Sequence, residues 1–117
     1  MVVKASISDE WLADRAALHD AMALSATLDG QTLTIHIDDE WPNVSQTDDE
    51  ATSFGGCLSF ERVEILEGNV ENVAGRIVSE LKLDGNHWLL YLARPSLFSR
   101  RGRFAFRAEA AIFIPES

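Results

Sequence analysis

Two hairpin signals, an isolated helix pattern and long alternating runs predict an α+β fold, a short N-terminal helix packed on a mostly antiparallel sheet of about six strands. Each hairpin signal is an Asp-Gly pair between two stretches of alternating apolar and polar residues. Alternation is typical of a strand with one buried face, and Asp-Gly suits a tight turn because both residues tolerate positive φ. A chain of 117 residues fits a single domain, 1–117.

The helix pattern runs from about Asp9 to Leu18. Ser8 or Ser6 precedes it as the cap, and acidic residues occupy its first turn, where they complement the helix dipole. The stripe expected to pack against the sheet consists of Trp11, Leu12, Arg15 and Ala16.

The first hairpin is predicted from residues 21–28 and 32–38, with Asp29 and Gly30 as its two turn residues. Such a loop pairs Ala26 with Leu33, Leu24 with Ile35 and Met22 with Ile37. We therefore expect Leu24 and Ile35 to face the core and His36 to lie opposite Ala23 on the polar face.

The second hairpin is predicted from residues 76–83 and 86–93, around Asp84-Gly85. A two-residue loop pairs Leu81 with Trp88 in the core and Lys82 with His87 on the other face, whereas a three-residue Asp-Gly-Asn loop would shift this register. The two Leu-Asp-Gly turns stand 55 residues apart. Either an internal duplication or shared turn chemistry explains that repetition.

The remaining runs leave alternatives open. Residues 57–60 and 63–66 are strand-like with a change of apolar parity at Glu61-Arg62, which a bulge would restore. Residues 46–56 read as a polar loop, and 68–73 as a connector with room for one helical turn. Residues 103–114 predict either one long strand or two strands broken at 108–111. As one long strand near the C-terminus it would be an edge that a second copy covers, so we expect a homodimer.

Composition excludes several classes of protein. The hydrophobic fraction is 46% and the charged fraction 25%, as in ordinary globular proteins. No apolar run is long enough to span a bilayer, and acidic residues rather than a signal-peptide core follow Met1-Val2-Val3-Lys4, so we expect a cytoplasmic protein. A net charge of -9 repels nucleic acid and anionic membranes. One cysteine, Cys57, excludes an internal disulfide, and no cofactor-binding motif occurs.

Charge is distributed unevenly along the chain. Residues 1–72 hold fifteen acids and three bases, whereas residues 73–117 hold four acids and seven bases. Acidic triplets flank an aromatic residue and a rigid proline in the first part, which suits the capture of a basic partner because charge speeds encounter and a tryptophan supplies binding energy. The predicted partner-binding residues are Asp38, Asp39, Glu40, Trp41, Asp48, Asp49 and Glu50. A solvated loop that keeps the protein soluble is the competing interpretation.

A second hypothesis places a small-ligand or divalent-metal site at the open end of the first hairpin. Continuing the predicted register sets His19 opposite Glu40 and Asp20 opposite Asp39. An imidazole and several carboxylates bind divalent ions. A hydrogen bond between His19 and Glu40 that fastens the hairpin is the alternative, because the chain has no metal-binding motif such as His-Glu-x-x-His.

A basic stripe occurs near the C-terminus. It consists of Arg94, Arg100, Arg101, Arg103 and Arg107. Because the whole chain is acidic, we expect these side chains to pair with carboxylates of the acidic half or of a second subunit rather than to bind nucleic acid.

The start of the first hairpin carries a resemblance over about 20 residues. Leu18-His19-Asp20-Ala21, Leu28-Asp29-Gly30 and Thr32-Leu33-Thr34-Ile35 resemble the opening of several small uncharacterised bacterial domains, some of which look like immunity proteins of toxin systems. The resemblance implies a cytoplasmic protein that blocks a toxin by binding it, and it transfers no functional residue. The leading hypothesis is therefore a non-enzymatic module that binds a basic partner without a cofactor.

Overall fold

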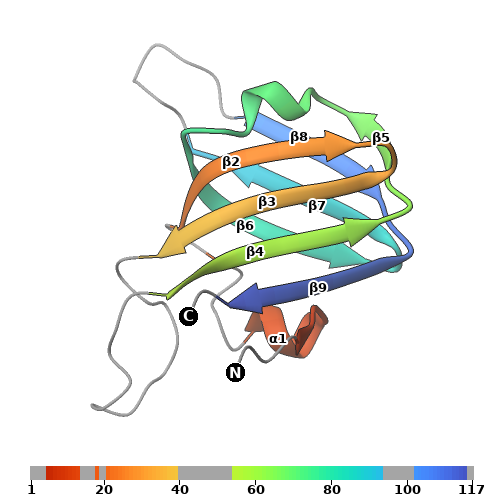
Figure 1. The fold of residues 1–117 in the computed structure, drawn as a ribbon, viewed down its shortest axis with the longest axis horizontal. Coiled ribbons are helices and arrows are strands. Elements are labelled where there is room, and N and C mark those ends of the chain that lie inside the picture. The colour runs from red at the N-terminus through yellow and green to blue at the C-terminus, as the bar shows by residue number, and fades with distance from the viewer. Residues whose placement is uncertain (1–4, 14–17, 19–20, 40–53, 94–101, 116–117) are drawn as a thin grey trace.

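The described chain forms a nine-stranded sheet in which neighbouring strands are antiparallel (Figure 1). The computed structural model describes residues 5–13, 18, 21–39, 54–93 and 102–115. The strands are β1 (Ala5–Ser6), β2 (Met22–Asp29), β3 (Thr32–Asp39), β4 (Phe54–Glu61), β5 (Glu64–Glu67), β6 (Arg76–Asp84), β7 (His87–Leu92), β8 (Gly102–Arg107) and β9 (Ala110–Pro115). Their order across the sheet is β1-β9-β4-β3-β2-β6-β7-β8-β5.

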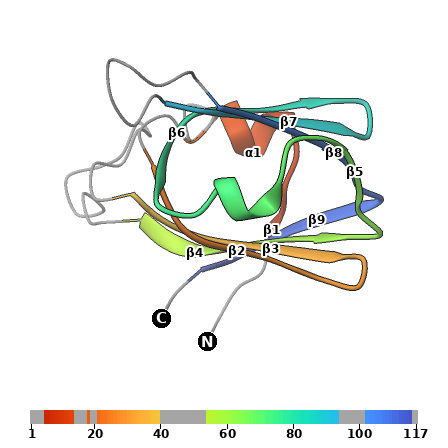
Figure 2. The same ribbon diagram turned by 90° about the horizontal axis from the view of Figure 1, so that it is seen from above.

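The sheet folds over between β2 and β6 and so makes two layers. These two strands pair only at Met22 with Ile77 and at Ala23 with Arg76. Figure 2 shows β2, β3 and β4 in one layer and β6, β7 and β8 in the other. The inward side chains of both layers form one core, whose largest fully buried members are Phe60, Phe104 and Phe106.

Helix α1 (Asp9–Ala13) lies between the layers (Figure 2). The hydroxyl oxygen of Ser8 accepts a hydrogen bond of 3.2 Å from the backbone N–H of Trp11, which confirms Ser8 as the cap. Trp11 and Leu12 are buried as predicted, and the Trp11 ring centroid lies 5.2 Å from that of Phe113. The described helix is shorter than predicted, because 14–17 lie outside the described residues.

The 3-10 helix η3 (Val70–Asn72) confirms the helical turn predicted in the connector after residue 68. The side-chain oxygen of Asn69 caps it by accepting a 3.1 Å hydrogen bond from the backbone N–H of Glu71. No helix within the described ranges is long and apolar enough to cross a membrane.

An internal pseudo-two-fold relates strands β2 to β5, here called the first half, to strands β6 to β9, the second half. Between β9 and β5 the order is β9-β4-β3-β2-β6-β7-β8-β5. Exchanging β2 with β6, β3 with β7, β4 with β8 and β5 with β9 gives the same order read from the other end. The fourth strand of each half pairs with the third strand of the other half: β5 pairs with β8, and β9 pairs with β4. The two halves therefore share a single strand plan.

Both hairpins form as predicted, but their turns lie one residue later. Asp29 pairs with Thr32 and Asp84 pairs with His87, so Gly30-Gln31 and Gly85-Asn86 are the turn residues. Gly30 has φ 62° and Gly85 has φ 65°. A turn that needs positive φ only at its first central position takes glycine there, which leaves the aspartate as the last strand residue.

A bulge at Leu24 overturns one of the predicted core positions. The register of β2 against β3 shifts between Ala23 and Ser25, so Leu24 is 47% exposed. Ile35 pairs with Ala26 and is buried. A bulged residue has no partner across the ladder and re-aims its side chain, which simple alternation does not reveal.

The second hairpin has its bulge at the equivalent position, between Val78 and Glu80. Leu81 and Trp88 are buried as predicted, but Leu81 pairs with Leu90 and Trp88 with Leu83 rather than with each other. The predicted pairing of Lys82 with His87 is also wrong, because Lys82 lies opposite Leu89.

At two places where the sequence suggested that a strand continues, the chain instead turns a corner and its next strand pairs with the other half. β4 ends at Glu61, the chain turns at Arg62, which has φ 55°, and β5 pairs with a different neighbour. Likewise, residues 103–114 form two strands, β8 and β9, which confirms the broken-strand alternative. The corners meet where the backbone N–H of Glu109 donates a 3.0 Å hydrogen bond to the carbonyl of Glu61.

The predicted fold class is thus correct only at the coarse level of a mostly antiparallel sheet with little helix. The prediction of about six strands is wrong, because nine are described. The reason given for a homodimer also fails, since β9 has β4 on one side and β1 on the other and is no edge. The polar loop expected over 46–56 is shorter, because β4 already begins at Phe54.

Candidate functional site

The predicted acidic site begins at the end of β3. Asp38 lies opposite Gly55 and Asp39 opposite Phe54, so the β3–β4 ladder places the two residues that flank 40–53 side by side. Asp38 is half-buried. The other predicted partner-binding residues lie outside the described residues; they are Glu40, Trp41, Asp48, Asp49 and Glu50.

The predicted metal site depends on a register that differs from the one observed. His19, Asp20 and Glu40 lie outside the described residues. The prediction required Met22 to face Ile37, whereas Met22 faces Asp38. Within the described ranges, no group of three or more His, Cys, Asp or Glu side chains is arranged to hold a metal ion.

The outer face of the layer formed by β6, β7, β8 and β5 carries two rows of polar side chains that sequence reasoning did not assemble. Each row crosses β6, β7, β8 and β5 in the order acid, ring, arginine, acid. One row is Glu80, Tyr91, Arg103 and Glu67; the other is Asp84, His87, Arg107 and Glu64.

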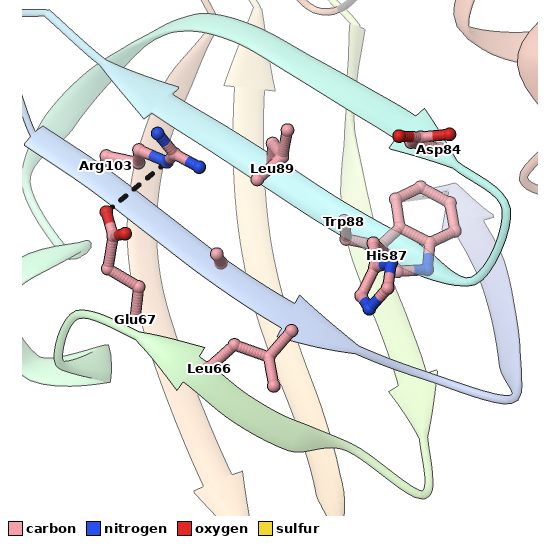
Figure 3. A pocket seen from close by; sticks show the side chains of 8 residues that line it. Leu66, Glu67, Asp84, His87, Trp88, Leu89 and Arg103 are labelled. Carbon is pink, nitrogen blue, oxygen red and sulfur yellow. Dashed lines mark ion pairs between the residues drawn. The ribbon is translucent and has the colours of Figure 1, made fainter.

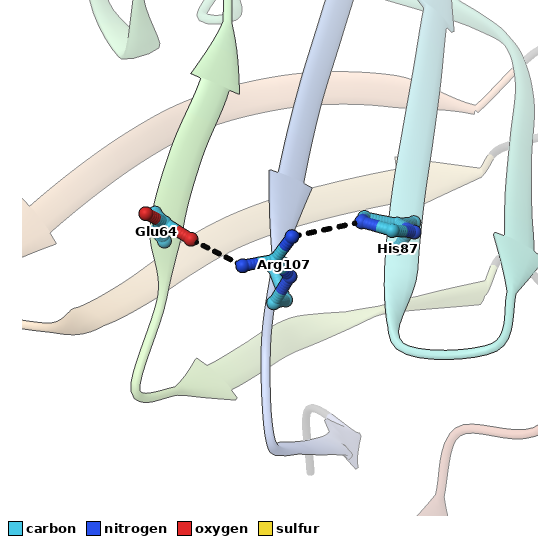
Figure 4. Close-up of polar contacts among 3 residues, drawn as sticks. All are labelled: Glu64, His87 and Arg107. Atoms are coloured by element: carbon cyan, nitrogen blue, oxygen red, sulfur yellow. Dashed lines mark hydrogen bonds and ion pairs between the residues drawn. The ribbon is translucent and has the colours of Figure 1, made fainter.

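Ion pairs connect β8 to β5 in both rows. Arg107 contacts Glu64 at 2.6 Å and the Nε2 atom of His87 at 3.2 Å (Figure 4). Arg103 contacts Glu67 at 3.3 Å and lies over the ring of Tyr91, 5.8 Å from its centroid. Arg103 and Arg107 of the basic stripe therefore pair with acids of the acidic half, as predicted. Exposed pairs of this kind contribute at most about 1 kcal/mol each to stability. The other arginines of the stripe lie outside the described residues; they are Arg94, Arg100 and Arg101.

A pocket of about 290 Å³ lies between the two rows (Figure 3). Leu66, Leu89 and Ala105 supply its apolar lining, and Arg103 with Glu67 borders it on one side. The hollow follows from the short side chain of Ala105, which stands on β8 between two arginines. An apolar floor bordered by donors and acceptors suits binding of a side chain or small molecule.

His36 and Cys57 are neighbours on the outer face of the first half. They lie directly opposite each other on β3 and β4, and both are half-buried. Such cross-strand pairs place their Cβ atoms about 4.5–5.5 Å apart. The sequence suggested Ala23 as the partner of His36, but the bulge at Leu24 places Ser25 there.

The residues sequence reasoning missed are Glu64, Leu66 and Glu67, all on β5. The sequence indicated a strand at residues 63–66, but the neighbours of β5 on β8 come from a segment about forty residues later. Comparison with protein-family models, with curated protein sequences and with solved structures found no match. A function is therefore argued from the residues themselves.

Proposed function

We propose that the protein is a non-enzymatic binding module that captures a basic protein through residues 38–50, in the manner of an immunity protein that inhibits a toxin. The observation that carries the proposal is the charge of this segment, which holds six acids and no lysine or arginine. Asp38, Asp39, Glu40, Asp48, Asp49 and Glu50 provide the charge, and Trp41 provides the apolar anchor.

The ladder between β3 and β4 supports this proposal. Pairing continues to Asp39, the last residue of β3, and Phe54, the first residue of β4. Binding residues are commonly carried by connections whose ends a rigid sheet holds in place. The proposal places the protein in the cytoplasm, as the immunity-like role implies.

The charge of the equivalent connection in the second half gives further support. The chain leaves β7 and enters β8 at the same end of the molecule as it leaves β3 and enters β4 (Figure 1). Residues 94–101 hold three arginines and no acid. Two connections of opposite charge between these strand ends would orient an approaching partner as well as attracting it.

The test compares two variants with the same change in net charge. In one, the six acids of residues 38–50 become amides. In the matched control, six exposed acids elsewhere become amides: Asp9, Glu10, Asp29, Glu61, Glu71 and Glu109. The tagged proteins are incubated with a lysate of the source cell, and captured proteins are identified by mass spectrometry.

We expect the unchanged protein and the control to retain a basic partner that the segment variant loses. Trp41→Ala should weaken that complex at least about tenfold, the loss typical of an aromatic anchor. Binding should also weaken as salt rises. A partner retained equally by both variants, or no partner at all, would refute the proposal.

A further inference from the structure

The pseudo-two-fold leaves one strand position beside β5 without an occupant among the described residues. It relates β5 to β9, and β9 has β1 as a further neighbour, with Ala5 opposite Phe113 and Ser6 opposite Ile112. The sheet order ends at β5, which pairs only with β8 in the described chain. A strand fits beside β9, so the shared plan provides the same position beside β5.

Exposed leucines occur on strands of the first half. Leu66 of β5 is 46% exposed, and Leu28, near the end of β2, is 37% exposed. The counterpart of Leu28 in the second half is Leu83, which is half-buried and packs against the core. The leucine at this position is therefore half-buried in the second half and exposed in the first half.

We propose that the free edge of β5 binds an extended segment of the basic partner as an additional antiparallel strand, in the position that β1 takes beside β9. This inference rests on the proposed function and states how part of that partner docks. Backbone hydrogen bonds along a free edge supply affinity, and alternate side chains supply specificity.

Charge on β5 favours a basic strand. Glu64 and Glu67 pair with arginines of β8 on one side, yet their side chains remain 61% and 52% exposed. A carboxylate accepts several hydrogen bonds, so each has capacity for a lysine or arginine on the added strand. A second copy of β5 in antiparallel register would instead oppose Glu64 to Glu67, which is repulsive.

The probe is a short blocked peptide of alternating lysine and valine. Lysines on one face would meet the β5 carboxylates, and valines would occupy the other face. Binding is measured by fluorescence anisotropy, and its location by amide chemical-shift changes in NMR spectra. We expect the changes to concentrate at residues 64–67.

Two substitutions of equal charge give a matched comparison. Leu66→Lys places a cation at the edge and should weaken binding at least about tenfold. Ile77→Lys alters an apolar residue of similar exposure, 42%, on the other half and should leave affinity within about twofold. A peptide methylated on the backbone nitrogens of its pairing edge should fail to bind the unchanged protein, which makes the test independent of variant folding.

Different experimental results would refute this inference and the proposed function. If peptide binding survives Leu66→Lys but is lost when the acids of 38–50 become amides, the peptide binds that segment and the edge inference is overturned. If the amide variant captures the partner as well as the unchanged protein does, while the peptide still binds β5, only the proposed function is refuted. A dimer in light scattering that Leu66→Lys dissociates would assign the position to a second copy and also overturn the inference.

Discussion

The first half and the second half of the molecule follow one strand plan but fill it with different residues. The first half contributes mainly aliphatic side chains to the core, among them Leu33, Ile35 and Ile37, whereas the second contributes Trp88, Phe104 and Phe106. The second half is also extended by β1 beside β9, whereas the part of the chain that the structure describes places no strand on the outer side of β5. A shared backbone plan therefore leaves core composition and surface free to diverge.

This difference separates what supports the fold from what is available for binding. Hairpins, bulges and crossed fourth strands occur in both halves, and they determine where the inward side chains meet. The acidic connection and the open edge of β5 belong to the first half alone. Features that break the pseudo-two-fold are therefore the ones to which we assign function.

The largest expected effect is at Phe60, where the halves meet. Its ring lies 5.0 Å from Trp88 and 4.8 Å from Phe106, centroid to centroid. Phe60→Ala should destabilise the protein by about 3–5 kcal/mol, because it removes a large buried ring of the first half that packs against two rings of the second half. Urea unfolding followed by tryptophan fluorescence and by circular dichroism should give coincident single transitions. Separate transitions would show that the halves are independent units.

The next effect tests the bulge at Leu24 in β2. Ile35→Ala should cost about 2–5 kcal/mol because this side chain is only 1% exposed. Leu24→Ala should cost less than about 1 kcal/mol, and Ile77→Ala in the second half should be as mild, since both residues are largely exposed. Urea midpoints of the variants give the comparison. A Leu24→Ala loss equal to that of Ile35→Ala would mean that β2 continues without a bulge.

A smaller effect compares glycines on the counterpart strands β4 and β8. A Cβ at Gly56 would lie 2.4 Å from the carbonyl oxygen of Ile114 and 2.6 Å from the Phe113 ring. A Cβ at Gly102 would lie 2.7 Å from a terminal guanidinium nitrogen of Arg76. Gly56→Ala should cost about 1–3 kcal/mol, because backbone and a packed ring must move.

Gly102→Ala should be milder than Gly56→Ala, because the far end of an arginine relocates more easily than a strand. That relocation would weaken the 2.7 Å hydrogen bond from Arg76 to the carbonyl of Ala93. Thermal unfolding of both variants measures the difference. Equal losses would indicate that Arg76 is held as firmly as the β9 backbone.

The elements were predictable wherever their signals are local. Asp-Gly turns, alternation and the serine cap depend on neighbouring residues, so both hairpins, the start of α1 and the helical turn after residue 68 were found. The buried positions of Ile35, Leu81 and Trp88 followed from the same alternation. The turn register was wrong because glycine alone, rather than the Asp-Gly pair, occupies the position that requires positive φ.

The sequence by itself determined the strand-rich composition, the placement of acids in the first part and arginines in the last, and most inward residues. Only the tertiary structure decided that β5 and β9 cross between the halves, that Leu24 is expelled at a bulge, and that Glu64 and Glu67 meet Arg107 and Arg103. The physical reason is range: turns and caps depend on residues a few positions apart. Strand partners depend on which faces can be buried together, and that is settled only when the whole sheet forms.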